Sequence, residues 1–319
     1  MHSALVVGLG RIGAGYDYNG DHSKTVTTHA SALNTHTDFC LVGGVDRDSS
    51  ARARFVEKFH LPVFNSLSHA LCKISPQIIV IAAPTISHLP IFLEAVTAHP
   101  KAIIVEKPFG ANLQDAETMA RAAKAAGVTL LINYVRRYEP GTNILKRKIA
   151  DGLFGDIYKG SVVYCKGLMN NGSHFIDLLD FLIGEVGIEK VIMSGRRITI
   201  SGIEDAEPDF VVTCGKARII FSTVRSEHFS LSGLTLYGTR GVVQYGDGKI
   251  QFRLVDKAPN MDITQLSQNE QSIPTDFERY QWHVLTALAG ALDGDIGALQ
   301  QGEESAINTM NIIGRINEI

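Results

Sequence analysis

The first 134 residues alternate short apolar runs with longer segments whose apolar residues recur every three or four positions. Short runs rich in β-branched residues predict buried strands, and the longer periodic segments predict helices. The predicted strands are 4–7, 39–45, 77–83, 102–105 and 128–134, and the predicted helices are 49–59, 67–73, 88–98 and 113–126. Because strand and helix alternate, we expect an α/β fold with a doubly wound parallel sheet.

The remainder of the chain alternates apolar and polar positions between short turns. This period of two predicts a mainly antiparallel sheet with strands at 156–166, 191–200, 209–214, 217–225, 231–238, 241–245 and 250–255. Helices are predicted at 143–151, from residue 173, at 276–292 and at 303–316. We therefore expect two domains, residues 1–134 and residues 135–319, the second an α+β domain with a large open sheet. Its few helices leave one sheet face uncovered, which favours a homodimer or homotetramer through that sheet.

Composition narrows the range of partners. A net charge of −3 and an isoelectric point near 6.4, without a block of Lys and Arg, argue against a nucleic-acid partner. The sequence shows no apolar run of membrane-spanning length and no leader-like N-terminus, so we expect a cytoplasmic protein with a small-molecule partner and no membrane contact. Cys40, Cys72, Cys165 and Cys214 lack paired spacing, so we expect neither disulfides nor a metal site, and place these thiols in or near the core.

The first predicted strand leads directly into a G-x-G-x-x-G sequence, Gly8 to Gly13. In this context Gly8 permits a tight turn, Gly10 lets the backbone approach a pyrophosphate, and Gly13 allows close helix packing. The second predicted strand ends on Asp46, the carboxylate expected to bind ribose hydroxyls. The combination predicts a Rossmann dinucleotide site, and a glycine-rich turn without a ligand is the alternative.

The spacing within this motif is irregular, because Asp46 lies 33 positions beyond Gly13 whereas roughly 20 is usual. The excess falls in the polar stretch 14–28, which we interpret as a loop inserted over the cofactor crevice or, alternatively, as a surface loop without function. The side chains through which it would contact a substrate are Tyr16, Tyr18 and His22. Since a carboxylate repels a 2′-phosphate, Asp46 favours NAD over NADP, although the neighbouring Arg47 keeps NADP open.

The apolar run 102–105 is followed by Glu106-Lys107-Pro108-Phe109-Gly110. A strand of this kind ends at the carboxyl edge of a parallel sheet, where open α/β sheets bind ligands, and would deliver the Lys107 ammonium there. Pro108 restricts Lys107 to an extended conformation and makes a cis peptide bond possible. A solvated Glu-Lys turn at the end of a strand is the alternative interpretation.

Two histidines stand near predicted helix starts. His174 lies in the first turn of the helix from Ser173, which Asn171 or Ser173 can cap. There the positive end of the helix dipole would keep the imidazole neutral and able to accept a proton, and a histidine without chemistry is the alternative. For His88, a ring whose hydrogen bonds are satisfied within the fold is favoured over a contact with a nicotinamide.

Together these motifs resemble the Gfo/Idh/MocA family of oxidoreductases over essentially the whole chain. The shared features are the glycine fingerprint, Ala83-Pro84, Glu106-Lys107-Pro108, Arg136-Arg137 with Pro140, Gly152-Leu153-Phe154-Gly155-Asp156 and Gly172-Ser173-His174-Phe175-Ile176-Asp177. The Glu-Lys-Pro and Gly-Ser-His-x-x-Asp segments, in this order, are the most specific part. The resemblance implies an NAD(P)-dependent oxidoreductase that acts on a sugar, polyol or nucleotide sugar, with substrate bound by the second domain.

The resemblance also implies roles for individual residues. Lys107 would hydrogen-bond the reacting oxygen of the substrate, and His174 would act as acid and base. Asn170 stands where the family usually has Asp; its amide can orient a hydroxyl but accepts no proton, and members acting on nucleotide-activated sugars can carry Asn here. The implied cofactor contacts are Gly8, Gly10, Arg11, Ile12, Gly13, Asp46, Arg47, Ala83, Pro84, His88, Glu106 and Lys107.

Many members of the family have a longer Gly-rich loop where this chain has a short link from Lys166 to Gly172, so substrate contacts are expected to come from elsewhere. The implied substrate contacts are Lys107, Tyr134, Arg136, Tyr164, Lys166, Asn170 and His174, with Arg137 as a further candidate. A surface role is the alternative for each of the cationic and aromatic members. Two other functions stay open on the same fold: reduction of a non-sugar carbonyl or conjugated compound, and NAD(P)-sensing regulation without catalysis.

Overall fold

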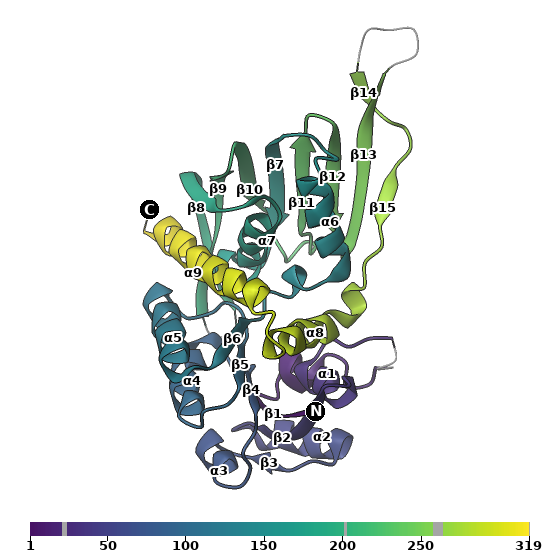
Figure 1. Ribbon diagram of the computed structural model, residues 1–319. Helices are drawn as coiled ribbons and strands as arrows, with labels where there is room; N and C mark the ends of the chain where they lie inside the picture. Colours follow the sequence, from purple (N-terminus) through teal and green to yellow (C-terminus); the bar gives the residue numbers. More distant parts are fainter. Residues whose placement is uncertain (21–23, 201–202, 258–263, 319) are drawn as a thin grey trace. The chain divides into compact units, whose positions relative to one another are not determined.

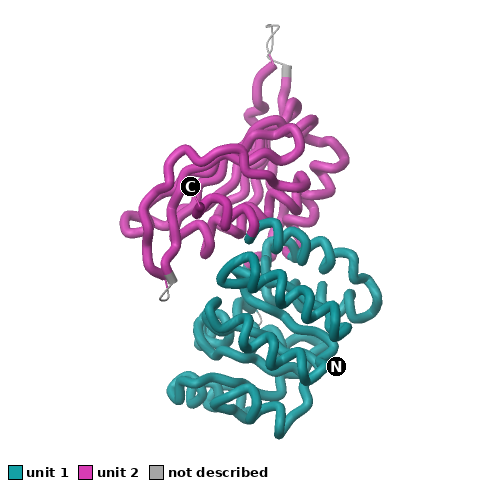
Figure 2. Tube along the Cα trace, turned by 90° about the vertical axis from the view of Figure 1, so that its left-hand side faces the viewer, with its two compact units in different colours: residues 1–138, 278–310 teal, residues 139–277, 311–319 magenta. Residues whose placement is uncertain are grey.

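The computed structural model describes residues 1–20, 24–200, 203–257 and 264–318. These residues form two compact units, residues 1–138 with 278–310 and residues 139–277 with 311–318 (Figure 2). Residues 278–310 therefore pack with the first unit, whereas a boundary at residue 134 assigns them to the second domain. His22 of the predicted inserted loop lies outside the described residues.

The first unit is built on a six-stranded parallel sheet in the order β3-β2-β1-β4-β5-β6. Its strands are β1 His2–Val7, β2 Phe39–Val45, β3 Val63–Phe64, β4 Ile78–Ile81, β5 Ala102–Val105 and β6 Thr129–Ile132. The side chains of β4 and β5 are completely buried, which explains why these strands read as uninterrupted apolar runs. The strand order reverses between β1 and β4, and the predicted doubly wound sheet is confirmed.

Helices cover both faces of this sheet. The helices are α1 His29–Thr35, α2 Ser49–Phe59, α3 Leu67–Leu71, α4 His88–Val96, α5 Leu113–Ala126 and α8 Tyr280–Leu292. In Figure 1, α4 and α5 lie together on one side of the sheet, and α1 and α2 lie on the other. Local sequence sets their ends: Asp48 and Asn112 accept backbone hydrogen bonds at the starts of α2 and α5, and Gly127 ends α5 in the left-handed conformation.

The second unit contains a nine-stranded sheet in the order β14-β13-β12-β11-β7-β10-β9-β8, with β15 paired to β13. Its strands are β7 Ile157–Tyr164, β8 Val186–Ile200, β9 Ile203–Cys214, β10 Ala217–Thr223, β11 Gly233–Gly238, β12 Gly241–Gly246, β13 Lys249–Lys257, β14 Thr264–Leu266 and β15 Gln271–Ile273. Among the described strands of this second sheet, only the pairing of β7 with β10 is parallel. The predicted mainly antiparallel sheet is therefore confirmed.

The boundaries of β8 and β9 were predicted less well than the sheet itself. These strands begin at Val186 and Ile203, five and six residues before the predicted starts, and β14 and β15 were not predicted at all. The pairing of β8 with β9 contains several register shifts, and most of β8 is exposed. A strand that is solvated and bulged loses the strict apolar alternation on which sequence-based assignment depends.

One face of this sheet is covered by helices and the other is open. The helices α6 Pro140–Ala150 and α7 Ser173–Ile183 lie on one face (Figure 1), and α9 Gly297–Asn317 closes the chain. Beneath α7 the inward side chains Val162, Ile219 and Phe221 are buried. The described residues place no helix on the outward face, where Ile220 is exposed and Tyr237 is half-buried.

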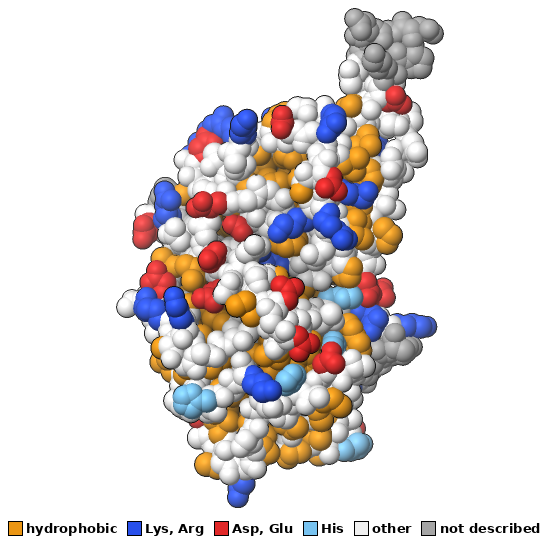
Figure 3. Space-filling view, viewed as in Figure 1, with side chains coloured by type: hydrophobic (Ala, Val, Ile, Leu, Met, Phe, Trp, Pro, Cys, Tyr) orange, Lys and Arg blue, Asp and Glu red, His pale blue; other side chains and the backbone are white. Residues whose placement is uncertain are grey.

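The surface agrees with the small net charge. On the face drawn in Figure 3, Lys and Arg side chains are interspersed with Asp and Glu. Within the described ranges, no helix is both long enough and apolar enough to cross a membrane. Cys165 and Cys214 are buried as expected, but Cys40 and Cys72 are exposed, which corrects their predicted place in or near the core.

Candidate functional site

The glycine fingerprint forms a tight turn between β1 and a single π-helical turn, Arg11–Gly15. Gly8 has φ +97°, and its N–H donates to the carbonyl of Val45 at 2.8 Å. A Cβ on Gly8 would stand 2.6 Å from the backbone of Ala82, and one on Gly13 would overlap the carbonyl oxygen of Gly8. A Cβ on Gly10 would meet no atom within 4 Å among the described residues. The open side at Gly10 fits a dinucleotide pyrophosphate that approaches the backbone there.

Asp46 is joined to this turn by hydrogen bonds. Its carboxylate accepts the N–H of Leu9 at 2.7 Å and the N–H of Asp48 at 2.9 Å. Arg52 donates to the backbone carbonyls of Asp46 and Arg47, and the Arg47 side chain is exposed. A carboxylate held at this position beside the glycine turn is the arrangement expected of a ribose ligand.

The carboxyl ends of β1, β4, β5 and β6 meet at one edge of the sheet. Backbone hydrogen bonds of 2.8–2.9 Å join Ala82 to Val7, Glu106 to Ile81 and Asn133 to Val105. The structure therefore brings the glycine turn, Ala83-Pro84, Glu106-Lys107 and Tyr134 to neighbouring positions on this edge. The Lys107–Pro108 peptide bond is cis, as the sequence allowed.

The side chains at this edge differ in exposure. Lys107 and Arg136 are half-buried, whereas Tyr134 and Arg137 are 1% and 5% exposed. Glu106 turns inward and is 6% exposed. Of the two adjacent arginines, Arg136 is thus the one that reaches solvent.

His88 is a structural residue in this arrangement. It is 1% exposed, and its ring nitrogens lie 3.0 Å from the carbonyl oxygen of Ala83 and 3.3 Å from that of Phe109. The ring lies between the loops after β4 and β5 and, as a neutral imidazole, donates to one of these two carbonyls. Its burial and these contacts favour the structural interpretation over the implied cofactor contact. Burial lowers the pKa of His88, against the smaller opposing effect of these carbonyls, so the ring is buried in its neutral form.

The neutral burial of His88 predicts loss of stability on acidification. Because its folded pKa lies below the ordinary value of about 6.5, its contribution is complete above that pH and is lost as the pH falls below it. His88→Leu should cost about 1–3 kcal/mol at neutral pH. It should also reduce the difference between unfolding free energies measured in urea at pH 7.5 and pH 5.5. His36, whose pKa burial also lowers, leaves a residual slope. An unchanged slope in His88→Leu, with exposed His69→Gln as the control, would contradict this account.

In the second unit, two carboxylates on β9 hold the link between β7 and α7. Asp205 accepts the N–H groups of Met169 and Asn170, each at 3.0 Å, and Glu207 accepts that of Lys166 at 3.1 Å. Gly167 has φ +86°, and a Cβ there would overlap the Asp205 carboxylate. Asp205 and Glu207 were not predicted as functional residues, because the predicted strand began only at residue 209. Their spacing of two residues is the signal that places both on one face of β9.

The start of α7 differs from the prediction. A π-helical turn, Leu168–Gly172, runs directly into α7, so neither Asn171 nor Ser173 caps it. Instead Ser173 donates to the Met169 carbonyl at 2.8 Å, and Asn171 donates to Ser232 at 2.8 Å. The Asp205 carboxylate already occupies the free N–H groups at this helix start. The expected cap by Asn171 or Ser173 is therefore wrong, and the N–H groups of Met169 and Asn170 are paired with Asp205.

The remaining predicted substrate contacts of this unit have distinct surroundings. Tyr164 is fully buried, donates to the carbonyl of Pro208 at 2.6 Å and packs edge-on against Phe210 and Phe221. We therefore assign Tyr164 a structural role in place of the implied substrate contact. The Lys166 side chain is exposed, its backbone lies at φ +64°, and its carbonyl accepts the Asn170 amide at 3.0 Å. His174 is half-buried at the second position of α7.

The predicted residues thus fall into two groups, one in each unit. The first unit carries the cofactor contacts with Lys107, Tyr134 and Arg136, and the second carries Tyr164, Lys166, Asn170 and His174. Two further groups of the first unit, His29 and Asn133, were missed and contact Glu106. In the described part of the chain, no group of three His, Cys, Asp or Glu side chains is arranged to hold a metal.

Comparison with known proteins places this geometry in context. Residues 3–134 match the family model described as "Oxidoreductase family, NAD-binding Rossmann fold". Trans-1,2-dihydrobenzene-1,2-diol dehydrogenase of Mus musculus is 24% identical over 56% of this chain and 58% of its own length. Glucose-6-phosphate 3-dehydrogenase of Bacillus subtilis is 28% identical over 50% of this chain and 42% of its own. The matched segments thus span about half the length of these relatives.

Two solved structures share the fold over nearly the whole chain. The WlbA dehydrogenase from Bordetella pertussis, in complex with NADH and UDP-GlcNAcA, has a TM-score of 0.70 and 20% identity, with 99% of this chain and 95% of that chain covered. A 3-ketoreductase from Actinomadura kijaniata, in complex with TDP-benzene and NADP, has a TM-score of 0.75 and 14% identity, with 98% and 96% covered. At such identities the likeness shows the fold alone.

Proposed function

We propose that this chain, whose residues 3–134 belong to the NAD-binding Rossmann domain of the Gfo/Idh/MocA oxidoreductases, is an NAD(P)-dependent dehydrogenase or reductase. Its reaction would be hydride transfer between nicotinamide and a hydroxyl or keto carbon of a sugar, polyol or nucleotide sugar. The observation that carries the proposal is the shared edge of the parallel sheet. There the open glycine turn follows β1, Asp46 follows β2, and Lys107 follows β5 of the same parallel sheet.

The protein's own residues would bind, orient and exchange protons. A bound nicotinamide would supply the hydride acceptor or donor. Lys107 would hydrogen-bond the reacting oxygen and stabilise the charge that develops on it. His174 would take the hydroxyl proton in oxidation or return it in reduction, and Asn170 would orient that hydroxyl without accepting a proton.

The substrate class is proposed from two relatives and one solved structure. One relative is named for glucose-6-phosphate, and the WlbA dehydrogenase was solved with UDP-GlcNAcA. The relative named for trans-1,2-dihydrobenzene-1,2-diol favours a second candidate, a non-sugar diol. A nucleotide sugar or sugar phosphate would suit the exposed Lys166 of the second unit or the half-buried Arg136 of the first, because either cation can bind a phosphate.

Cofactor and substrate can be tested together by fluorescence titration with NADH and NADPH, alone and with nucleotide sugars, sugar phosphates or trans-dihydrodiols. Asp46 should make NADH bind about tenfold more tightly than NADPH. The true substrate class should tighten that binding and support hydride transfer, followed by the absorbance of the reduced nicotinamide. If neither dinucleotide binds, the oxidoreductase proposal fails and the glycine turn is structural.

We also propose self-association through the open face of the second unit. Its outward positions combine Ile220, Tyr237 and Val242 with charged neighbours, a mixture that suits an interface with a second copy. Light scattering should give a mass of two or four times 34.7 kDa. Ile220→Glu should weaken the assembly at least tenfold, whereas Glu304→Lys on α9 serves as a surface control. A parent protein that stays monomeric at high concentration would contradict this.

A further inference from the structure

Glu106, directly before Lys107, is part of a buried polar cluster in the first unit. Its Oε1 lies 2.8 Å from His29 Nε2 and accepts the Asn133 amide at 2.6 Å. Its Oε2 lies 3.2 Å from the backbone N–H of Lys107, which donates to it. His29 and Asn133 are each 1% exposed. Both oxygens of the carboxylate are therefore held by donors of the protein.

The cluster favours an ionised Glu106. Burial acts to raise its pKa, but the hydrogen bond and charge of His29, the Asn133 amide and the positive charge of Lys107 outweigh burial and leave the pKa below its ordinary value. The titratable groups that interact electrostatically with this carboxylate are His29 on α1, His88 on α4, Lys107 after β5 and Tyr280 on α8. The carboxylate charge in turn favours the ammonium form of Lys107.

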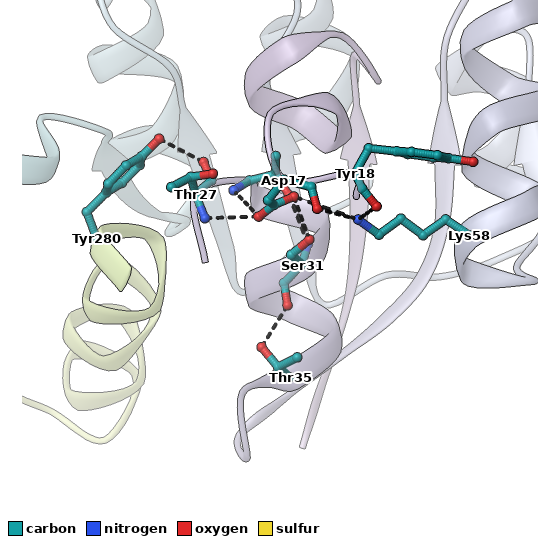
Figure 4. Close-up of polar contacts among 8 residues, drawn as sticks. Asp17, Tyr18, Thr27, Ser31, Thr35, Lys58 and Tyr280 are labelled. Atoms are coloured by element: carbon teal, nitrogen blue, oxygen red, sulfur yellow. Dashed lines mark hydrogen bonds and ion pairs between the residues drawn. The ribbon is translucent and has the colours of Figure 1, made fainter. Parts of the chain in front are cut away.

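His29 is the first residue of α1. The start of that helix is held by contacts of Asp17 and Thr27 (Figure 4). The buried carboxylate of Asp17 accepts the N–H groups of Thr27 and Thr28, each at 3.0 Å, and the hydroxyls of Thr28 and Ser31 at 2.7 and 2.9 Å. Lys58 of α2 donates to the carbonyls of Asp17 and Tyr18, each at 2.8 Å.

A further contact joins Thr27 to α8. The Tyr280 hydroxyl donates to the Thr27 carbonyl at 2.9 Å (Figure 4). The segment predicted as a loop over the crevice is thus anchored to α1, α2 and α8. These hydrogen bonds hold the start of α1, where His29 lies against Glu106.

We propose that His29 is a positioning residue for Lys107, acting through Glu106, and that the contacts of Asp17, Thr27 and Thr28 serve to hold His29 against that carboxylate. The proposal rests on the proposed function only in making Lys107 the group that meets the substrate. Without the His29 donor, a buried carboxylate is driven towards its neutral form. The Lys107 ammonium then loses the stabilising negative charge of the Glu106 carboxylate.

The test is competitive acetylation of Lys107 at pH 8, quantified by mass spectrometry, in His29→Leu and His29→Gln. Leu removes the donor, whereas the amide nitrogen of Gln reaches about as far as imidazole Nε2 and can still donate. His29→Leu should raise the Lys107 acetylation rate about tenfold, because the ammonium loses the attraction of an ionised Glu106. His29→Gln should stay within about twofold of the parent. Lys101, exposed at the opposite end of β5, is the internal control and should not change.

The outcomes separate this inference from the proposed function, because acetylation needs neither cofactor nor substrate. Unchanged Lys107 acetylation in His29→Leu, with Lys101 also unchanged, overturns the inference. If His29→Leu does not fold, His29→Asn, whose shorter amide falls short of Glu106, is tested under the same criterion. A parent without hydride transfer would defeat the proposed function alone. Where turnover is present, the alkaline limb of the pH profile should move to lower pH in His29→Leu and return in His29→Gln.

Discussion

Lys107→Ala is expected to lower turnover about 10²- to 10³-fold while dinucleotide affinity stays within a few-fold of the parent. The size follows from removing a hydrogen-bond donor that faces the charge developing on the reacting oxygen. Binding should survive because, in the proposed site, the open glycine turn and Asp46 would hold most of the dinucleotide and the lysine ammonium would not. Turnover is measured with the substrate class found in the titration, and affinity by the fluorescence of NADH.

The matched control for this variant is Lys101→Ala. Lys101 precedes β5 and is exposed, so the same change of residue is made at the amino end of the strand, away from the ligand edge. Its turnover should equal that of the parent. If Lys107→Ala keeps full turnover, the lysine has no part in the chemistry. If Lys107→Ala loses turnover and the protein's biological role is nevertheless intact, an NAD(P)-sensing regulator becomes the better description.

Gly13→Ala is expected to lower the stability of the fold, and Gly10→Ala is expected to weaken dinucleotide binding without affecting stability. A Cβ on Gly13 overlaps the Gly8 carbonyl oxygen, and because that atom belongs to the backbone, it can move aside only by disturbing the turn. Gly13→Ala should therefore lower the free energy of unfolding by about 3 kcal/mol or more. A Cβ on Gly10 meets nothing within 4 Å among the described residues, so Gly10→Ala should fold normally and weaken NADH binding about tenfold or more.

The pair can be read in two measurements, urea unfolding and NADH titration. Urea unfolding distinguishes a packing defect from a binding defect, because only Gly13→Ala should lower the urea concentration at the unfolding midpoint. Undiminished NADH affinity in Gly10→Ala would show that a dinucleotide does not pass over this turn. Equal loss of stability in both variants would show that Gly10 also packs against the fold.

Much of the first unit was predictable because single residues there have single physical reasons. The runs 39–45 and 102–105 match their strands: 102–105 is completely buried and uniformly apolar, and 39–45 is largely buried, with only Cys40 exposed. Gly127 marks the end of α5 because only the left-handed conformation closes the helix there. The Lys107 position followed from the same logic of strand ends.

What sequence could not supply were the partners of buried polar groups. Tyr164 was expected to meet substrate because an aromatic residue near a strand end looks the same whether it faces a cavity or, as here, Phe210 and Phe221. The pairing of His29 with Glu106 joins residues 77 positions apart, and no local pattern reports it. Residues 278–310 pack with the first unit, although they lie within the predicted second domain in sequence. An amphipathic helix does not reveal which core it will cover.

The start of the helix that carries His174 already has its own anion, the Asp205 carboxylate. A helix beginning of this kind commonly serves as a receptor for a phosphate or carboxylate group of a ligand. Here that receptor is filled from within, and an incoming anion would meet repulsion instead of attraction. If the substrate is a nucleotide sugar or sugar phosphate, we expect charge selection to come from exposed cationic side chains such as Lys166. Recognition of the anionic group should then weaken steeply as salt is added.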